Sequence, residues 1–263
     1  MKRLATLFAF ALVLGLAVGG AQAKEWKTVR IGVEGAYPPF SWVDPDGTLK
    51  GFDIDIAFAL CKKMGAKCTL VQQDWDGMIP ALLARKFDAI IASMSITDKR
   101  KKKVAFTNPY YNTPAKFARR KGSGIEISKA GLKGKTVGVQ RATTHDDFIT
   151  GEFGDEVTIK RYATQDDAYL DAEAGRVDLL LADSVAMADG FLNTPAGKDW
   201  EFVGPGFNDP KYFGHGAGIA VRKQTNDLRE MFNKALDGIV KDGTYARIMH
   251  KYFDFNIYVK PLG

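Results

Sequence analysis

Two stretches share one pattern: Lys86-Phe87-Asp88-Ala89-Ile90-Ile91-Ala92-Ser93 and Arg176-Val177-Asp178-Leu179-Leu180-Leu181-Ala182-Asp183. Each begins with a basic residue at the end of a predicted helix and continues with an Asp and an apolar run. Each ends on a polar residue at the carboxyl end of the predicted strand. The apolar runs predict buried strands, and their likeness suggests that the chain contains one structural unit twice.

Strands and helices alternate around both stretches. The first set has predicted strands at 29–33, 69–72 and 87–93, with helices at 53–64 and 76–86. The second set has predicted strands at 135–140, 157–161 and 177–182, with helices at 143–152 and 164–175. Alternation of this kind predicts parallel sheets with right-handed crossovers. We therefore expect an α/β protein with two lobes, each a mostly parallel sheet flanked by helices.

The tail adds a strand at 218–222 and an amphipathic helix at 227–242, which could pack on either lobe. If it rejoins the first, the chain crosses between the lobes twice, near 112–116 and 205–211, where Pro and Gly residues suit a two-stranded hinge. The predicted division is then lobe I at 24–113 and 210–263, and lobe II at 114–209.

The first 23 residues have the pattern of a secretory signal peptide. Lys2-Arg3 precede an apolar run, and Ala21-Gln22-Ala23 form a small-residue cleavage site. Cleavage after Ala23 predicts a mature, exported, periplasmic chain. It keeps 35 basic and 31 acidic residues, and so small an excess of positive charge does not indicate nucleic-acid binding. We expect a monomer.

Cys61 and Cys68 are the only cysteines, and in an exported protein they predict one disulfide. Asp53 is the predicted N-cap of the helix at 53–64, and Gly65 is placed to end it in the left-handed conformation. Cys68 can then fold back toward Cys61. No His lies nearby, so metal or catalytic thiol chemistry is not expected, nor is any cofactor.

Ligands of open α/β sheets bind at the carboxyl ends of the strands. In the first set, Ser93, Ser95 and Arg100 offer two hydroxyls and a guanidinium, a combination that suits a carboxylate. The alternative is that Arg100 belongs to a solvated basic face at 99–103.

In the second set, Gln140, Thr143, Thr144 and Asp183 follow strand ends. The threonines could bind ligand or serve as ordinary helix caps. Asp183 could receive an ammonium group or act only as an N-cap.

Glu34 is presented where the first strand opens into a loop, with Tyr37 just beyond it and Trp75 in a later loop. The aromatic rings could flank an aliphatic or planar cationic side chain or belong to the core. Together these candidates complement a zwitterion with an additional positive charge. The sequence lacks the motifs of serine hydrolases, zinc proteases, P-loop proteins and dinucleotide-binding proteins, and no metal site is expected.

The chain resembles the solute-binding proteins of polar amino-acid ABC importers, most closely the lysine/arginine/ornithine- and arginine/ornithine-binding group. The resemblance spans 24–263, and the paired cysteines fall at that group's disulfide positions. It is carried by Arg30-Ile31-Gly32-Val33-Glu34 with Tyr37-Pro38-Pro39-Phe40, Gly51-Phe52-Asp53-Ile54-Asp55-Ile56, Asp74-Trp75-Asp76-Gly77-Met78-Ile79-Pro80, Ser93-Met94-Ser95-Ile96-Thr97-Asp98-Lys99-Arg100, Ala174-Gly175-Arg176-Val177-Asp178, Gly190-Phe191-Leu192 and Lys251-Tyr252-Phe253.

The resemblance implies a type II periplasmic binding protein with its ligand in the cleft between the lobes. It implies that Arg100, Ser95 and Thr144 bind the ligand carboxylate, and that Asp183 and Ser93 bind the α-ammonium. Tyr37 and Trp75 would flank the side chain, and Glu34 with Gln140 to Thr143 would meet its distal group. The chain departs from the lysine/arginine/ornithine type at Glu34, Trp75, Gln140 and His145.

We therefore expect a receptor, not an enzyme, that closes on a cationic L-amino acid and delivers it to the membrane subunits of an ABC permease. Arginine is the first candidate ligand, followed by ornithine, lysine and histidine. The alternatives are a receptor for opines or neutral polar amino acids, and an enzyme related to periplasmic cyclohexadienyl dehydratases.

Overall fold

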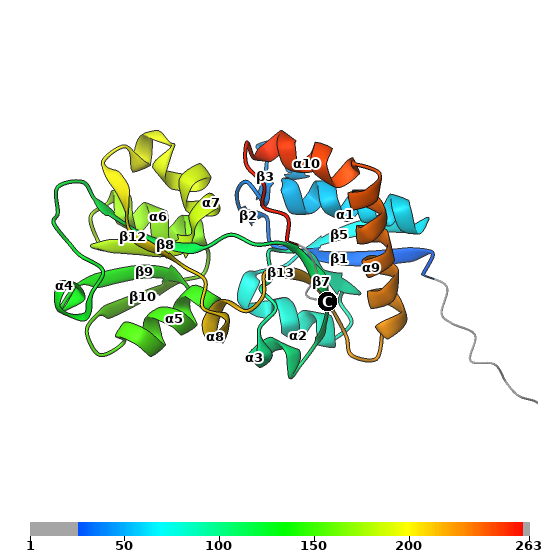
Figure 1. Cartoon of the computed structure of the whole chain (residues 1–263), viewed down its shortest axis with the longest axis horizontal. Coiled ribbons are helices and arrows are strands. Elements are labelled where there is room, and N and C mark those ends of the chain that lie inside the picture. Colours follow the sequence, from blue (N-terminus) through cyan, green and yellow to red (C-terminus); the bar gives the residue numbers. More distant parts are fainter. Residues whose placement is uncertain (1–25, 260–263) are drawn as a thin grey trace, which may run out of the picture.

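Two sheets, each flanked by helices, lie side by side along the long axis of the molecule (Figure 1). The computed structural model describes residues 26–259. The predicted signal peptide at 1–23 and its cleavage after Ala23 lie outside the described residues. No helix within residues 26–259 is both long and apolar enough to cross a membrane.

The first sheet has five strands, in the order β5 (Lys67–Gln72), β1 (Thr28–Val33), β6 (Ala89–Ile90), β13 (Ala217–Val221) and β7 (Ala105–Tyr111). Four of them run in the same direction, because β1 is parallel to β5 and β6, while β13 is antiparallel to both its neighbours. A small antiparallel sheet lies beside it, with strands β2 (Ala36–Tyr37), β3 (Ser41–Val43) and β4 (Leu49–Lys50).

The helices that accompany this sheet are α1 (Phe52–Met64), the short 3-10 helix η1 (Trp75–Gly77), α2 (Met78–Leu83), α3 (Asp98–Lys101), α9 (Asn226–Lys241) and α10 (Thr244–Tyr252). The apolar side of α9 is buried, as its periodicity predicts, through Leu228, Phe232, Ala235, Leu236 and Ile239. The tail therefore packs with the first sheet, where α1, α9, α10 and the strands share one apolar core.

The second sheet has the order β10 (Thr158–Tyr162), β9 (Thr136–Gln140), β11 (Leu179–Asp183), β8 (Ala115–Arg120) and β12 (Trp200–Phe207). Again four strands share one direction, and β8 is the reversed one. Its helical segments are α4 (Lys129–Leu132), α5 (Thr144–Phe153), α6 (Gln165–Glu173), α7 (Ser184–Met187), η2 (Ala188–Leu192) and η3 (Pro195–Gly197).

The reversed strand in each sheet is the one that follows a crossing from the other sheet. The chain passes from β7 to β8 and returns from β12 to β13. The parallel strands of both sheets point their carboxyl ends toward the junction, so a chain arriving across it must run against them. The α/β class with two mostly parallel sheets is confirmed.

The second connection contains α8 (Pro210–Phe213). The Tyr212 hydroxyl donates a hydrogen bond of 2.6 Å to Glu152 Oε1, and the Tyr212 ring packs edge-on against Phe148, so α8 lies on α5. The predicted lobe boundary at residue 210 thus coincides with the first residue of a helix that contacts the second sheet. The division at 24–113, 114–209 and 210–263 stays a prediction.

The prediction of Asp53 as the N-cap of α1 is wrong. Gly51 occupies that position with φ +129°, and a Cβ there would lie 2.2 Å from the carbonyl oxygen of Phe40. Only glycine fits such a close approach in this conformation. Asp53 instead lies in the first turn with its side chain fully buried.

The predicted disulfide between Cys61 and Cys68 is present, with 6.1 Å between the two Cα atoms. Gly65 ends α1 with φ +68°, as expected, and lets the chain return into β5. Cys68 pairs with Val29 near the amino end of β1. The disulfide therefore lies at the opposite end of β1 from Glu34.

Candidate functional site

The ten side chains predicted to bind a ligand line a single pocket between the two sheets. They are Glu34, Tyr37, Trp75, Ser93, Ser95, Arg100, Gln140, Thr143, Thr144 and Asp183. Several of them share a position at the carboxyl end of a strand. Glu34 follows β1, Ser93 follows β6, Gln140 ends β9 and Asp183 ends β11. The facing carboxyl ends of parallel strands thus bring together residues that lie far apart in the sequence.

Arg100 points into the pocket although its neighbours in the sequence do not. Lys101, Lys102 and Lys103 are exposed, whereas Arg100 is half-buried. Thr97 caps α3 by accepting the Arg100 N–H, and the guanidinium Nη1 donates a 3.0 Å bond to the carbonyl oxygen of Ser95. Burial lowers the pKa of Arg100 to about 10, so the group stays positive at neutral pH and can attract an anion.

Asp183 is the N-cap of a helix, one of its two predicted roles, and it also lines the pocket. As N-cap of α7 its Oδ1 accepts the N–H groups of Val185 at 2.8 Å and Ala186 at 3.1 Å. Its Oδ2 accepts a hydrogen bond from the Thr113 hydroxyl, and the residue still lines the pocket. Burial raises the pKa of Asp183 above its ordinary value. A neighbouring cation would stabilise the charged form of this carboxyl group.

Glu34 is 6% exposed and also lines the pocket. Gln140 Nε2 donates a 2.5 Å bond to Glu34 Oε1 and a 3.2 Å bond to the carbonyl oxygen of Ala163. Burial raises the pKa of Glu34 to about 8 despite the hydrogen bond from Gln140. A buried carboxylate of this kind is stabilised in its charged form by a neighbouring positive charge.

Two aromatic rings line the same pocket as these charged groups. Tyr37 lies on β2, and Trp75 opens η1 with 9% of its surface exposed. Trp75 Nε1 donates a 3.2 Å hydrogen bond to the carbonyl oxygen of Ala142, and the Arg100 guanidinium carbon lies 5.2 Å from the Trp75 ring centroid. Trp75 is therefore fixed between elements of both sheets.

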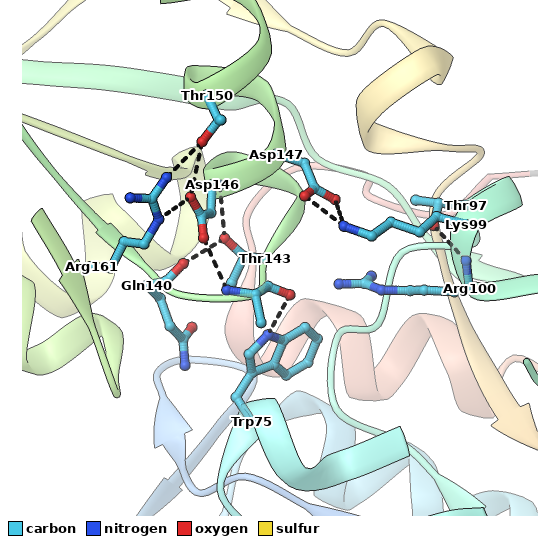
Figure 2. A network of polar contacts seen from close by, with 11 residues as sticks. Trp75, Thr97, Lys99, Arg100, Gln140, Thr143, Asp146, Asp147, Thr150 and Arg161 are labelled. Atoms are coloured by element: carbon cyan, nitrogen blue, oxygen red, sulfur yellow. Dashed lines mark hydrogen bonds and ion pairs between the residues drawn. The ribbon is translucent and has the colours of Figure 1, made fainter. Parts of the chain in front are cut away.

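Polar contacts also link the two sheets' elements outside the pocket (Figure 2). Lys99 Nζ bonds to both carboxylate oxygens of Asp147, at 2.7 and 2.8 Å. Arg141 Nε donates a 2.6 Å bond to Asp76 Oδ2. Figure 2 shows Lys99 reaching Asp147 on one side of Arg100, and Trp75 bonded to the loop between Gln140 and Thr143.

The pocket also contains residues that the sequence did not single out as binding residues. They are Ala92, Tyr111, Asn112, Thr113, Ala115, His145, Phe213, Gly216 and Ala217. The only signal for Asn112 and Thr113 was their place in a predicted hinge. His145 lies in the first turn of α5; burial and the nearby charge of Arg100 lower its pKa to about 3, so it is neutral. Among residues 26–259, no three His, Cys, Asp or Glu side chains are grouped to hold a metal ion.

Two lobes with a pocket between them that is lined by side chains of opposite charge define a binding protein of the periplasmic type. Residues 29–255 match the family of bacterial extracellular solute-binding proteins, family 3, and the chain belongs to that family. An L-arginine-binding protein of Pseudomonas aeruginosa is 51% identical over 98% of this chain and 99% of its own.

Further similarities agree with this assignment. A lysine/arginine/ornithine-binding periplasmic protein of Escherichia coli is 44% identical over 96% of this chain and 98% of its own length. The solved structure of a Salmonella typhimurium periplasmic binding protein, described for its high arginine specificity, superposes with a TM-score of 0.80 at 36% identity. It covers 86% of this chain and 99% of that chain. The predicted membership of this group is confirmed.

Proposed function

We propose that the chain is an exported receptor that binds a cationic L-amino acid, with arginine as the preferred ligand, and delivers it to an ABC importer. The observation that carries this proposal is the buried Glu34 carboxyl with its pKa near 8, in the same pocket as Arg100 and Asp183. The arginine-binding relatives named above support it.

In the proposed complex, Arg100 pairs with the ligand carboxylate with help from Ser95 and Thr144. Asp183 receives the α-ammonium, assisted by Ser93. The methylene chain and guanidinium run between Tyr37 and Trp75 toward Glu34, where Gln140 and Thr143 also lie. A guanidinium suits this end of the pocket because it stacks on aromatic rings and binds a carboxylate through two parallel hydrogen bonds.

The proposal also includes the following features, which rest on the sequence patterns described above. The mature chain begins at Lys24 after cleavage behind Ala23, acts in the periplasm as a monomer, and binds no nucleic acid. Residues 24–113 and 210–263 form lobe I, and residues 114–209 form lobe II. Ligand contacts from both lobes favour the closed state, which the permease membrane subunits recognise.

The alternatives have less support in the pocket. An opine carries an additional carboxylate, for which the polar side chains of Gln140 and Arg141 would be the candidate partners. Arg141 is exposed and pairs with Asp76, and Gln140 donates to Glu34. A dehydratase would need a general acid over an apolar ring, whereas here three ionisable groups complement a charged amino acid.

A thermal-shift panel with calorimetric confirmation tests the proposal, because a ligand that binds only the folded state raises the melting temperature. The panel contains L-arginine, L-ornithine, L-lysine, L-histidine, L-citrulline, L-glutamine and octopine. We expect the largest shift with L-arginine and a much smaller one with L-citrulline, its uncharged near-isostere. A larger shift with citrulline or octopine, or none with any member, would contradict the proposal.

A further inference from the structure

Asp53 is a buried acidic residue that does not cap α1. It also forms no salt bridge with another residue in the described part of the chain. Its side chain is 0% exposed. Tyr110 donates its hydroxyl proton to Asp53 Oδ1 at 2.7 Å, and Ser93 Oγ donates to Asp53 Oδ2 at 2.9 Å. An ionised carboxylate accepts hydrogen bonds only, so both hydroxyl protons are directed at Asp53.

Ser93 is the point at which this buried group reaches the pocket. It lines the pocket and has a φ of +53°, which non-glycine residues seldom adopt. Its backbone N–H donates to the Tyr110 hydroxyl at 3.3 Å, so Asp53 and Tyr110 hold both the backbone and the side chain of Ser93. Tyr110 is fixed in turn, because Tyr245 donates a 2.6 Å bond to its carbonyl oxygen.

A serine hydroxyl has one proton and two lone pairs. When Asp53 is ionised, the Ser93 proton is committed to it, and the oxygen can then offer the pocket only acceptor capacity. A primary ammonium group has three donors and no acceptor, so it matches this hydroxyl. A carboxylate, an acceptor, does not.

We propose that Asp53 is a positioning residue for the ligand's α-ammonium group, acting through Ser93, whose hydroxyl oxygen the ionised Asp53 carboxylate orients as an acceptor in the pocket that Asp183 also lines. The inference rests on the proposed amino-acid receptor function. Within that function, it assigns a role to a residue that does not itself contact the ligand.

The surroundings of Asp53 agree with this role. The titratable side chains near it are tyrosines, namely Tyr110 and Tyr111 of β7 and Tyr245 of α10. Burial raises the pKa of Asp53 to about 7, since the hydrogen bonds only partly offset the loss of solvent. A ligand ammonium beyond Ser93 supplies the positive charge that this carboxyl otherwise lacks.

A double-mutant cycle tests the inference, with L-arginine affinity measured by calorimetry for the wild type, Asp53→Asn, Ser93→Ala and the double variant. We expect each single change to weaken binding about tenfold and the double variant to be no weaker than Asp53→Asn. The asparagine amide would donate to Ser93 and turn its proton toward the ammonium. Multiplicative losses, or wild-type affinity in Asp53→Asn, would overturn the inference.

Two controls separate this role from effects on the fold and from failure of the proposed function. Asp55→Asn changes the next acid on α1, which bonds to Lys251 and Tyr252, and should leave affinity unchanged. If Asp53→Asn does not fold, Tyr110→Phe removes the other donor to Asp53 and should show the same non-additivity with Ser93→Ala. If the wild type binds no L-arginine, the receptor function itself fails.

Discussion

Glu34 and Gln140 meet across the pocket, where Gln140 Nε2 donates a 2.5 Å hydrogen bond to Glu34 Oε1. One residue follows β1 of the first sheet and the other ends β9 of the second. The contact therefore joins the two sheets at the group that we propose as the counter-ion of the ligand side chain. Its protonation state should control both ligand choice and the pH dependence of binding.

Arginine affinity should rise with pH and level off near pH 8. Burial raises the pKa of Glu34 to about 8, so at lower pH the unliganded carboxyl is mostly protonated and must lose its proton to pair with a guanidinium. Between about pH 6 and pH 8 the affinity should increase by up to ~10-fold per pH unit. Calorimetry in buffers of different ionisation enthalpy would measure the released proton directly.

The substitution Glu34→Gln isolates the contribution of the Glu34 charge to arginine binding. The variant should bind L-arginine far more weakly at pH 8, lose little affinity for L-citrulline or L-glutamine, and show a flatter pH profile. Wild-type binding of citrulline should vary less with pH, because that ligand has no distal cation. Equal losses for arginine and citrulline would refute the cation-binding role of Glu34.

Removing Arg100 should strongly weaken the binding of every α-amino acid tested. Charge-assisted hydrogen bonds are among the stronger polar contacts, and truncating one partner of a buried charged pair costs about 2–5 kcal/mol. Arg100→Ala should therefore weaken L-arginine and L-ornithine alike by ~100-fold or more. Calorimetry measures the loss, and a loss of less than about tenfold for either ligand would contradict the role. Lys101→Ala on the same helix is the matched control, since Lys101 is exposed.

Local sequence was enough to predict the strand ends and the charged groups placed on them. Glu34 directly follows β1 and Asp183 ends β11, so their position at the carboxyl ends of apolar strands follows from the local sequence. The link between Asp53 and Ser93 could not be predicted this way, because the two residues are 40 positions apart and meet only after packing. Asp53 was assigned as a helix cap because Asp is a common cap, and the close approach of Gly51 to Phe40 had no sequence signal.

Phe213 is a second residue whose place in the pocket could not be predicted from local sequence. It lies in a connection between the sheets, and nothing in its neighbourhood marks it as a pocket residue. Only the packing of α8 on α5 brings it to His145, with ring centroids 5.8 Å apart. Residues placed by tertiary contacts of single side chains are thus the part of the site that local patterns leave out.

The disulfide should contribute to stability and not to binding. Closing so short a loop should stabilise the fold by about 2–3 kcal/mol through the unfolded state. Cys61→Ser combined with Cys68→Ser should lower the urea midpoint accordingly. L-arginine affinity should stay unchanged, because Cys68 pairs near the start of β1 and Glu34 follows its end. Thiol titration of the unfolded, unreduced mature protein should detect no free thiol; two would disprove the bridge.

The ion pair between Lys99 and Asp147 should favour the closed state of the receptor and do so only at low ionic strength. Lys99 lies on α3 and Asp147 on α5, so the pair spans the two lobes, and exposed pairs of this kind contribute under ~1 kcal/mol. Lys99→Ala should speed ligand release and weaken L-arginine binding about twofold to fivefold at low salt.

The effect should vanish near 1 M salt because screening is strong there. Lys101→Ala is the control: Lys101 pairs with Asp98 three residues away on the same helix, so its loss should not affect closure at any salt concentration. Asp147→Ala should add nothing to Lys99→Ala if the two act as a pair. Stopped-flow dissociation at two salt concentrations would distinguish these outcomes, and a loss that persists at high salt would show that Lys99 acts in another way.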